Sequence, residues 1–386
     1  MEVFELIAPC HFGLESVMKR EILDLGYEIS SVEDGKVTFL GDAQAIAYAN
    51  IFLRTTERIL LKVGQFQAET FEELFEKTRS LPWERYIPKN GKFWVTKANS
   101  IKSKLFSPSD IQSIMKKAMV ERLKTAYGMD WFPEDGSSYP IRVALLKDQV
   151  TIGLDTTGIS LHKRGYRKLT AKAPITETLA AALLMLTPWK KDRILADPFC
   201  GSGTFAIEAA LMAASMAPGL KRSFQAQQWG NLVPGSCWKD AREEAQDLIC
   251  LPKNPQIWAS DIDGAMIQAA RENARLAGVD QLIHFRRQDV AEFTHPGQYG
   301  FLVTNPPYGE RLEEKENLPG LYKALGERFA LLDTWSLYLI TSYEDAQRMI
   351  GRNARKNRKI YNGMLKTYFY QYPGPKPPKH KEGEAD

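Results

Sequence analysis

The sequence of 386 residues is poor in the side chains that hold metal ions or form disulfides. It contains four cysteines and five histidines, and the cysteines (Cys10, Cys200, Cys237 and Cys250) form no CxxC pair. Few, scattered thiols are typical of proteins from a reducing compartment. The histidines and cysteines show no zinc-ligand spacing. We therefore expect a cytoplasmic protein without a bound metal.

Long hydrophobic runs are also missing. No stretch approaches the eighteen consecutive apolar residues that a membrane-spanning helix needs, so we expect no membrane span. The first residues carry two acids, Glu2 and Glu5, and no basic segment, which argues against a secretory signal. The net charge is only +4, so any contact with nucleic acid must come from local basic patches.

The length and the pattern of the chain predict several domains. Residues 1–60 and 61–156 each have the pattern of a small α+β unit. Residues 157–172 resemble a basic linker. Helical patterns then alternate with short apolar runs over 173–372, which is typical of an α/β domain with a mainly parallel sheet. Residues 373–386 are rich in proline, lysine and glycine and are predicted to be disordered.

A glycine-rich turn follows the first predicted strand of the α/β domain. The strand ends at Asp197, and the sequence continues Pro198-Phe199-Cys200-Gly201-Ser202-Gly203-Thr204 before an apolar helical pattern. Glycines at such a turn let the backbone approach a ligand closely, and the first βα turn of such sheets binds nucleotides. A P-loop is excluded because no lysine follows Gly203. A nicotinamide dinucleotide remains an alternative on this motif alone.

Carboxylates also follow the next two predicted strands. Asp261-Ile262 ends the second, and Asp289-Val290 ends the third. A carboxylate after the second strand can accept both ribose hydroxyls, and one after the third can accept the amino hydrogens of adenine. Residues 213–255, between the first helix and the second strand, are predicted to be a surface excursion.

The fourth predicted strand ends in Asn305-Pro306-Pro307-Tyr308. Two prolines stiffen the backbone and remove two N–H donors. The Asn305 side-chain oxygen and the Pro306 carbonyl can then accept the hydrogens of a base amine, which directs the nitrogen lone pair at a methyl donor. The Tyr308 ring can stack on the target base. The alternative is that this segment is a rigid Pro-Pro turn without catalytic function. The presence of the glycine-rich turn in the same domain disfavours this alternative.

The two motifs resemble motifs I and IV of class I, Rossmann-like amino-group methyltransferases. Within these, the chain is similar over nearly its whole length to the THUMP-containing 23S ribosomal RNA guanine-N2 methyltransferase L family. The resemblance implies a ferredoxin-like unit over 1–60, an RNA-binding THUMP domain over 61–156, and a methyltransferase domain over 173–372.

The resemblance also implies S-adenosyl-L-methionine as cofactor and RNA as partner. The residues implied to bind the cofactor are Ala173, Pro174, Asp197, Phe199, Gly201, Gly203, Thr204, Asp261, Ile262, Asp289, Val290 and Asn305. Asn305, Pro306, Pro307 and Tyr308 would hold the target amine. The family has members with a second methyltransferase domain, whereas this sequence carries one.

Basic clusters are the candidate RNA contacts. The predicted linker has no acid between Asp155 and Glu177, and it contains Lys163, Arg164, Arg167 and Lys168. A second acid-free run lies between Asp345 and Glu382. Clusters without acids are better candidates for phosphate contacts than isolated lysines on solvated helices.

Three functions remain open at the level of sequence. The first is N2 methylation of a guanine in 23S rRNA. The second is methylation of adenine N6 in DNA or RNA, or of guanine in tRNA. The third is a catalytically silent RNA-binding protein, which the intact Asn-Pro-Pro-Tyr loop disfavours. The oligomeric state is left open.

Overall fold

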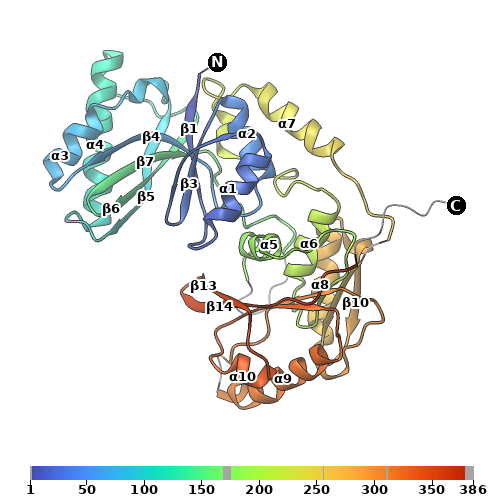
Figure 1. Ribbon diagram of the computed structural model, residues 1–386. Coiled ribbons are helices and arrows are strands. Elements are labelled where there is room, and N and C mark those ends of the chain that lie inside the picture. Colours follow the sequence, from blue (N-terminus) through green and yellow to red (C-terminus); the bar gives the residue numbers. More distant parts are fainter. Residues whose placement is uncertain (1, 168–174, 255, 310–311, 379–386) are drawn as a thin grey trace. The chain divides into compact units, whose positions relative to one another are not determined.

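The chain folds into two compact units that share its segments in an interleaved way (Figure 1). The computed structural model describes residues 2–167, 175–254, 256–309 and 312–378. The first unit consists of residues 1–10, 18–161 and 217–247, and the second of 11–17, 162–216 and 248–386. Each unit therefore combines segments that are distant in sequence.

The first unit is built on a seven-stranded sheet of order β2-β3-β1-β4-β7-β6-β5. The strands are β1 (Phe4–Pro9), β2 (Glu28–Glu33), β3 (Lys36–Gly41), β4 (Leu60–Gln67), β5 (Lys92–Ile101), β6 (Ser138–Leu146) and β7 (Gln149–Asp155). The helices are α1 (Glu15–Asp24), which begins in the second unit, α2 (Ala43–Phe52), α3 (Phe71–Arg79), α4 (Pro108–Tyr127) and α7 (Gly235–Asp247).

This single sheet differs from the two separate α+β units that the sequence predicts. β1 of the ferredoxin-like range pairs with β4 of the THUMP range, with Leu6 opposite Leu61. Both leucines are fully buried in one hydrophobic core. The two ranges are therefore joined through a shared sheet and core, because each leaves an open strand edge that the other covers.

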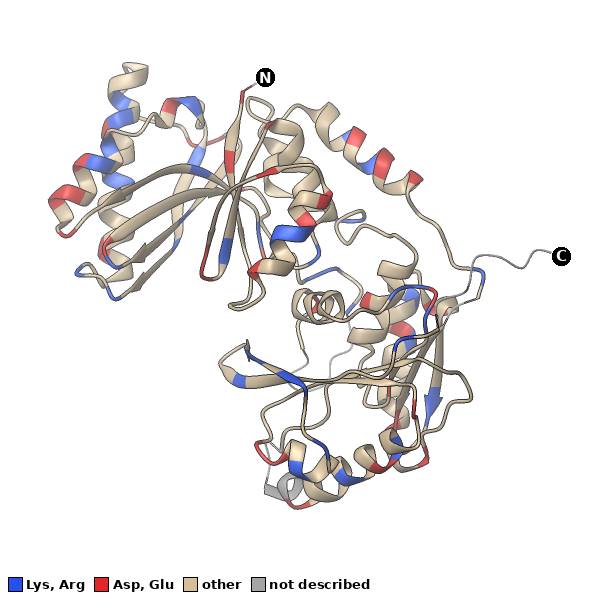
Figure 2. Ribbon diagram, viewed as in Figure 1, with Lys and Arg blue, Asp and Glu red and all other residues tan. Residues whose placement is uncertain are grey.

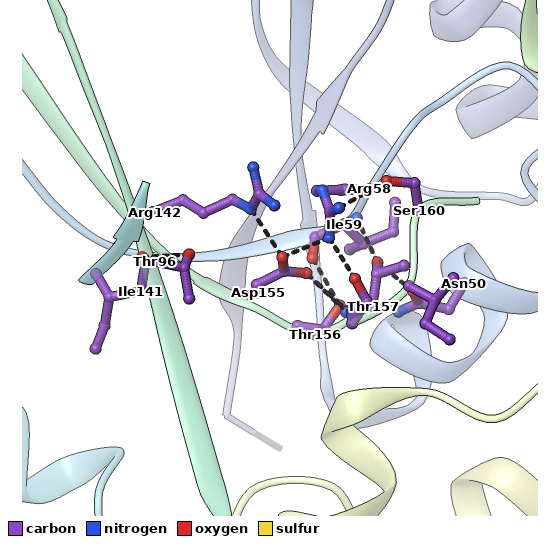
Figure 3. A network of polar contacts seen from close by, with 12 residues as sticks. Asn50, Arg58, Ile59, Thr96, Ile141, Arg142, Asp155, Thr156, Thr157 and Ser160 are labelled. Atoms are coloured by element: carbon purple, nitrogen blue, oxygen red, sulfur yellow. Dashed lines mark hydrogen bonds and ion pairs between the residues drawn. The ribbon is translucent and has the colours of Figure 1, made fainter. Parts of the chain in front are cut away.

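A buried polar network fixes the chain where it leaves β7 (Figure 3). The Asp155 carboxylate accepts bonds from Arg58 at 2.6 Å and from Arg142 at 2.8 Å. Arg58 also donates to the carbonyl of Gly158 at 2.6 Å. Asn50 on α2 bonds the hydroxyls of the two threonines that follow Asp155. These bonds satisfy polar groups that would be costly to bury unpaired, and they define one path for residues 156–160.

The segment 217–247 corrects the predicted surface excursion over 213–255. Figure 1 shows α7 beside α2. Trp229 is fully buried, stacks on Tyr139 at 5.0 Å between ring centroids, and donates its indole N–H to the carbonyl of Ser138 at 2.8 Å. Trp238 stacks on Phe224 in the same core. Large aromatic side chains contribute strongly to a core, so this segment is part of the first unit.

The second unit contains the predicted α/β sheet. Its order is β10-β9-β8-β11-β12-β14-β13, and the first five strands are parallel. The strands are β8 (Leu195–Asp197), β9 (Ile257–Asp261), β10 (Ile283–Arg287), β11 (Phe301–Thr304), β12 (Ser336–Thr341), β13 (Lys356–Asn362) and β14 (Leu365–Tyr372). The helices are α5 (Glu177–Leu186), α6 (Thr204–Ala213), α8 (Gly264–Ala277), α9 (Leu312–Ala330) and α10 (Ala346–Ile350).

Helices bury both faces of this sheet, as the continuous apolar strands require. α5, α6 and α8 contribute to a core with Val303 and Ile340. α9 and α10 pack on the opposite face, where Leu302 and Leu339 lie. This mainly parallel sheet with helices on both faces agrees with the predicted Rossmann-like α/β fold class. Among the described residues, no helix is long and apolar enough to cross a membrane.

The beginning of the predicted disordered tail is packed. The Gly374 N–H donates to Ser336 Oγ at 2.9 Å, and a side chain at position 374 would lie 2.3 Å from the carbonyl oxygen of Trp335. Order therefore continues past β14. Residues 379–386, where the rest of the predicted tail falls, lie outside the described residues.

We expect Trp229→Ala to destabilise the first unit by about 3–5 kcal/mol, because it removes a fully buried ring and its hydrogen bond. Urea unfolding followed by circular dichroism measures this loss. Trp131, in the same unit, is 73% exposed, and its replacement by alanine is the matched control. Equal stability of the two variants would contradict the structural role of segment 217–247.

Candidate active site

Parallel strands bring the predicted site residues to one edge of the sheet in the second unit. β8 ends at Asp197 and β9 at Asp261, while Asp289 and Asn305 follow β10 and β11. These four strands are consecutive in the sheet. Their carboxyl ends therefore form a row, and the strand order reverses between β9 and β11 at β8. This reversal is the usual ligand position in an open α/β sheet.

The glycine turn is held against the second strand. Gly201 and Gly203 adopt left-handed conformations with φ of 50° and 89°, which favour glycine. The Gly201 N–H donates to Asp261 Oδ2 at 2.9 Å, and the Cys200 N–H donates to the carbonyl of Ser260. A Cβ at Gly203 would lie 3.1 Å from Ala270, whereas Gly201 faces open space. The turn thus leaves room for a ligand above Gly201.

α6 begins directly after this turn. Gly203 is its N-cap and offers no side-chain oxygen to the first backbone N–H groups. The amides at the beginning of α6 and their dipole therefore favour a group with negative charge or lone pairs. A carboxylate, such as that of a bound amino acid, fits this environment.

Asp197 joins the ends of two strands. Its Oδ1 accepts the Thr304 hydroxyl at 2.6 Å and the Phe199 N–H at 3.2 Å. The residue is only 1% exposed, and burial raises the pKa of its carboxyl to about 7, against the two hydrogen bonds that favour the charged form. The carboxyl thus connects the glycine turn to the end of β11, which Asn305 follows.

A pocket of about 270 Å³ lies beside the turn. It is lined by Pro198, Phe199, Ile262, Asp289, Val290, Ala291, Gly320, Leu321 and Ala324. Four of these residues were predicted to bind the cofactor. The walls are mostly apolar, and the Asp289 carboxylate, which also accepts the Ala291 N–H at 2.8 Å, supplies the acceptor. An apolar slot with one carboxylate is suited to a flat heterocycle with an amino group.

The Asn-Pro-Pro-Tyr loop is braced from outside. The Tyr322 hydroxyl on α9 donates to the carbonyl of Pro307 at 3.2 Å and bonds the Thr341 hydroxyl at the end of β12. Within the loop, the Tyr308 hydroxyl donates to Asn305 Oδ1. The acceptor expected to grip a base amine is thus already engaged by a hydrogen bond within the loop. Gly309 ends the loop with a φ of 75°.

The structure gives two of the predicted RNA-binding residues another role. The Arg164 side chain is 2% exposed and lies 3.5 Å from the Glu208 carboxylate on α6. Arg167 pairs with Glu177 at 3.3 Å and donates to Thr204 Oγ1 at 2.8 Å. Arg164 is buried and paired, and Arg167 is largely covered and bonded to two partners, so neither is placed to meet RNA phosphates in this arrangement. We correct their interpretation to one of structural support. Of the other two, Lys163 is exposed and Lys168 lies outside the described residues, as do Ala173 and Pro174.

Sequence reasoning missed the acidic partners of these arginines. Glu208 interrupts a helix whose other residues are apolar or small, and it accepts the buried Tyr166 hydroxyl at 3.0 Å. A lone acid on a fully buried helix requires a partner, and that signal predicts an internal ion pair. Burial is the main cause that raises the pKa of Glu177.

The buried Asp197 should make stability depend on pH. The pKa of the Asp197 carboxyl in the folded protein is above the usual value. Its contribution to the free energy of unfolding is therefore greatest below pH 4 and is lost as the pH rises to about 7. We expect the thermal stability of the ligand-free Asp197→Asn variant to fall less than that of the unchanged protein between pH 4.5 and 7.5. Differential scanning calorimetry across this range measures the difference. Parallel profiles would show that Asp197 ionises normally.

Removal of a buried charge partner should destabilise the second unit. We expect Arg164→Ala to cost about 3–5 kcal/mol, because Glu208 would stay buried and unpaired. The exposed neighbour variant Lys163→Ala is the control. Chemical unfolding measures stability, and RNA binding at several salt concentrations tests the alternative. A flatter salt dependence for Arg164→Ala, with unchanged stability, would restore the RNA-binding interpretation.

Comparison with protein families agrees with this architecture. Residues 164–371 match the RMKL-like methyltransferase domain, 5–60 the RlmL ferredoxin-like domain, and 68–155 the THUMP domain. The described residues contain no group of three potential metal ligands.

Individual proteins are similar over the whole chain. A Bacillus subtilis protein, YpsC, whose name proposes an RNA methyltransferase, is 48% identical over all of both chains. The ribosomal RNA large subunit methyltransferase K/L of Cellvibrio japonicus is 33% identical over 96% of this chain, which spans 51% of that protein.

Two solved structures have nearly the same fold. SMU.472, described as a candidate methyltransferase in complex with SAH, has a TM-score of 0.92 at 41% identity and covers 98% of this chain and 100% of its own. A Listeria monocytogenes protein, described from its sequence as an N6-adenine-specific DNA methylase, has a TM-score of 0.91 at 46% identity over 97% of both chains.

The predicted S-adenosyl-L-methionine cofactor is thus confirmed for the family, and the turn, the pocket and the carboxylates described above fit its parts. The chain belongs to the RMKL-like methyltransferase family, with RlmL ferredoxin-like and THUMP domains.

Proposed function

We propose that this protein transfers the methyl group of S-adenosyl-L-methionine to the exocyclic N2 amine of a guanine in 23S ribosomal RNA. The carrying observation is the position of Asn305, Pro306 and Tyr308 at the end of β11, next to the glycine turn after β8. The Asp197–Thr304 hydrogen bond holds these two strand ends together.

The cofactor would lie along the row of strand ends. The amides at the glycine turn suit its carboxylate, Asp261 its ribose hydroxyls, and the pocket beside Asp289 its adenine. In this assignment Asp261 has two tasks, because it already accepts the Gly201 and Asp263 N–H groups. When bound, the cofactor supplies an activated sulfonium methyl group.

The chain's own residues would prepare the amine. A guanine amine has a lone pair delocalised into its ring, and two acceptors that grip its hydrogens weaken this delocalisation. Asn305 Oδ1 and the carbonyl of Pro306 are those acceptors in the proposal. The bond that Asn305 Oδ1 accepts from the Tyr308 hydroxyl supports this role. An arriving amine would replace the tyrosine hydroxyl, which frees the ring to stack on the base.

Positioning carries most of the catalysis in this mechanism. The brace from Tyr322 to Pro307 keeps the loop in place, and the burial of Pro306 limits its movement. After transfer, the positively charged nitrogen is acidic enough to lose a proton to water. No basic side chain is therefore required before the methyl group moves.

RNA is favoured by the THUMP range and by the names of the two relatives. The K/L relative acts on the large-subunit ribosomal RNA according to its name, which supports 23S rRNA. Such a reaction would take place in the cytoplasm, as the cysteine content predicts. The name of the Listeria structure favours adenine N6 in DNA as the second candidate. The Asn-Pro-Pro-Tyr motif does not by itself distinguish between the two amines.

Asn305→Ala should reduce methyl transfer at least about 100-fold, because the variant lacks one of the two acceptors for the amine. Transfer of labelled methyl groups to ribosomal RNA from a strain without this protein measures the loss. Cofactor binding by calorimetry should change much less than transfer, since Asn305 is only one of the residues implied to bind the cofactor, and the turn, Asp261 and Asp289 remain. Full activity of the variant would refute the role of the loop.

The labelled product identifies the target. Nucleoside mass analysis should give N2-methylguanosine from 23S rRNA. N6-methyladenine from DNA or RNA would establish the second candidate. Methylguanosine found only in tRNA would show that the substrate is tRNA and not 23S rRNA. Incorporation into none of these nucleic acids would leave a protein that only binds RNA.

A further inference from the structure

The hairpin of β13 and β14 extends past the catalytic edge of the sheet. Thr304 at the end of β11 pairs with Leu339 on β12. Leu339 pairs with Tyr370 on β14, and Tyr370 pairs with Asn357 on β13, so these residues mark the level at which β11 ends. Five residues on each hairpin strand lie beyond that level. At about 3.4 Å per residue, the hairpin reaches roughly 17 Å past the strand that carries Asn305.

One face of this extension alternates cations and aromatic rings. Lys359 pairs across the strands with Tyr368, and Tyr361 pairs with Lys366. Cross-strand partners and residues two apart share a face, so these four side chains form a square with like groups on its diagonals. The ammonium of Lys359 lies 5.2 Å from the Tyr361 ring, and that of Lys366 lies 5.2 Å from the Tyr368 ring. We call these four residues the hairpin face.

The opposite face is part of the domain core. Ile360 and Phe369 are fully buried there, and Arg358 donates to the carbonyl of Gly13. The hairpin is therefore anchored mainly on that side, while Lys359, Tyr361 and Lys366 of the hairpin face are exposed. Lys359 and Lys366 are exposed and Tyr361 is 40% exposed. Packing thus does not account for Lys359, Lys366 and Tyr361, whereas Tyr368 is half-buried and packs against the core that contains Tyr370.

The hairpin face is also continuous with the catalytic loop. Tyr322 bonds both the carbonyl of Pro307 and the hydroxyl of Thr341, and Thr341 pairs with Tyr368. The Tyr322 ring also packs on Tyr343 at 4.9 Å between centroids. A polymer that enters the loop with one base thus has the hairpin face on its path.

All charged side chains of the β13–β14 hairpin are basic. Residues 356–372 contain four basic side chains and no acid, and Figure 2 shows Lys and Arg on this hairpin without Asp or Glu. Glu344, in the loop after β12, is an acidic residue that interacts electrostatically with Lys366. Alternating ammonium groups and rings match alternating phosphates and bases of a single strand, whereas a duplex hides its base faces.

We propose that the hairpin face binds the single-stranded RNA that flanks the target nucleotide, with Lys359 and Lys366 on phosphates and Tyr361 stacked on a neighbouring base. This inference rests on the proposed function and adds a docking site to it. The site would guide the strand to the loop and favour targets in unpaired regions.

Binding of a labelled single-stranded RNA of 12 nucleotides to the full-length protein, followed by fluorescence anisotropy, tests this site. Lys359→Ala/Lys366→Ala should flatten the slope of log affinity against log salt by about 1.4, since each phosphate contact on a single strand contributes about 0.7. Tyr361→Ala should weaken binding about 5- to 150-fold, the range of one base stack, and Tyr361→Phe should restore it.

The matched control is Lys323→Ala/Arg275→Ala, which removes the same charge from exposed ion pairs on α9 and α8 of the same unit. It should leave affinity and slope nearly unchanged. Thermal unfolding and cofactor binding verify that each variant is folded. A 12-base-pair RNA duplex should show little dependence on Tyr361.

The outcomes separate this proposal from the proposed function. If hairpin variants bind the single strand as the control does while the protein methylates RNA, the hairpin site is refuted and the function stands. Equal losses on duplex and single strand would also refute it. The protein could instead methylate no RNA, while Tyr361→Ala weakens single-strand binding and Tyr361→Phe does not. The hairpin site would then stand, and the proposed methyltransferase function would be refuted.

Discussion

The direct pairing of β11 with β8 is the constraint on which the site depends. The chain makes β9 and β10 on one side of β8 and then returns to place β11 on the other. The hydrogen bond from Thr304 to Asp197 closes this junction in a buried environment. The glycine turn and the Asn-Pro-Pro-Tyr loop, more than one hundred residues apart, are neighbours for this reason alone.

Ion pairs next to the glycine turn give the candidate site a second support. Two arginines of the segment 164–167 pair with acids on α5 and α6, the helices next to the glycine turn. Such pairs stabilise a fold only modestly, but loss of one partner is costly, so they favour a single arrangement. Arg167 reaches Thr204, the first residue of α6, and so connects this segment to the turn itself.

Neither unit is made from one continuous stretch of chain. Residues 11–17 belong to the methyltransferase unit although they lie between strands of the other, and 217–247 return to the first unit from within the second. The returning segment brings two tryptophans to the core of the first unit. The ferredoxin-like and THUMP ranges thus depend on a part of the chain that lies far beyond both in sequence.

The sequence by itself determined the fold class, the row of strand-end residues and the two motifs. These follow from local signals: apolar runs of strand length, glycines at a sharp turn, and prolines after a strand. Only the tertiary structure decided which charges face solvent. Arg164 and Lys163 look equivalent in the sequence, yet one is buried against Glu208 and the other is exposed. Packing likewise decided that segment 217–247 joins the first unit. Strand register decided that Lys359, Tyr361, Lys366 and Tyr368 form one square. Both depend on partners that local sequence does not specify.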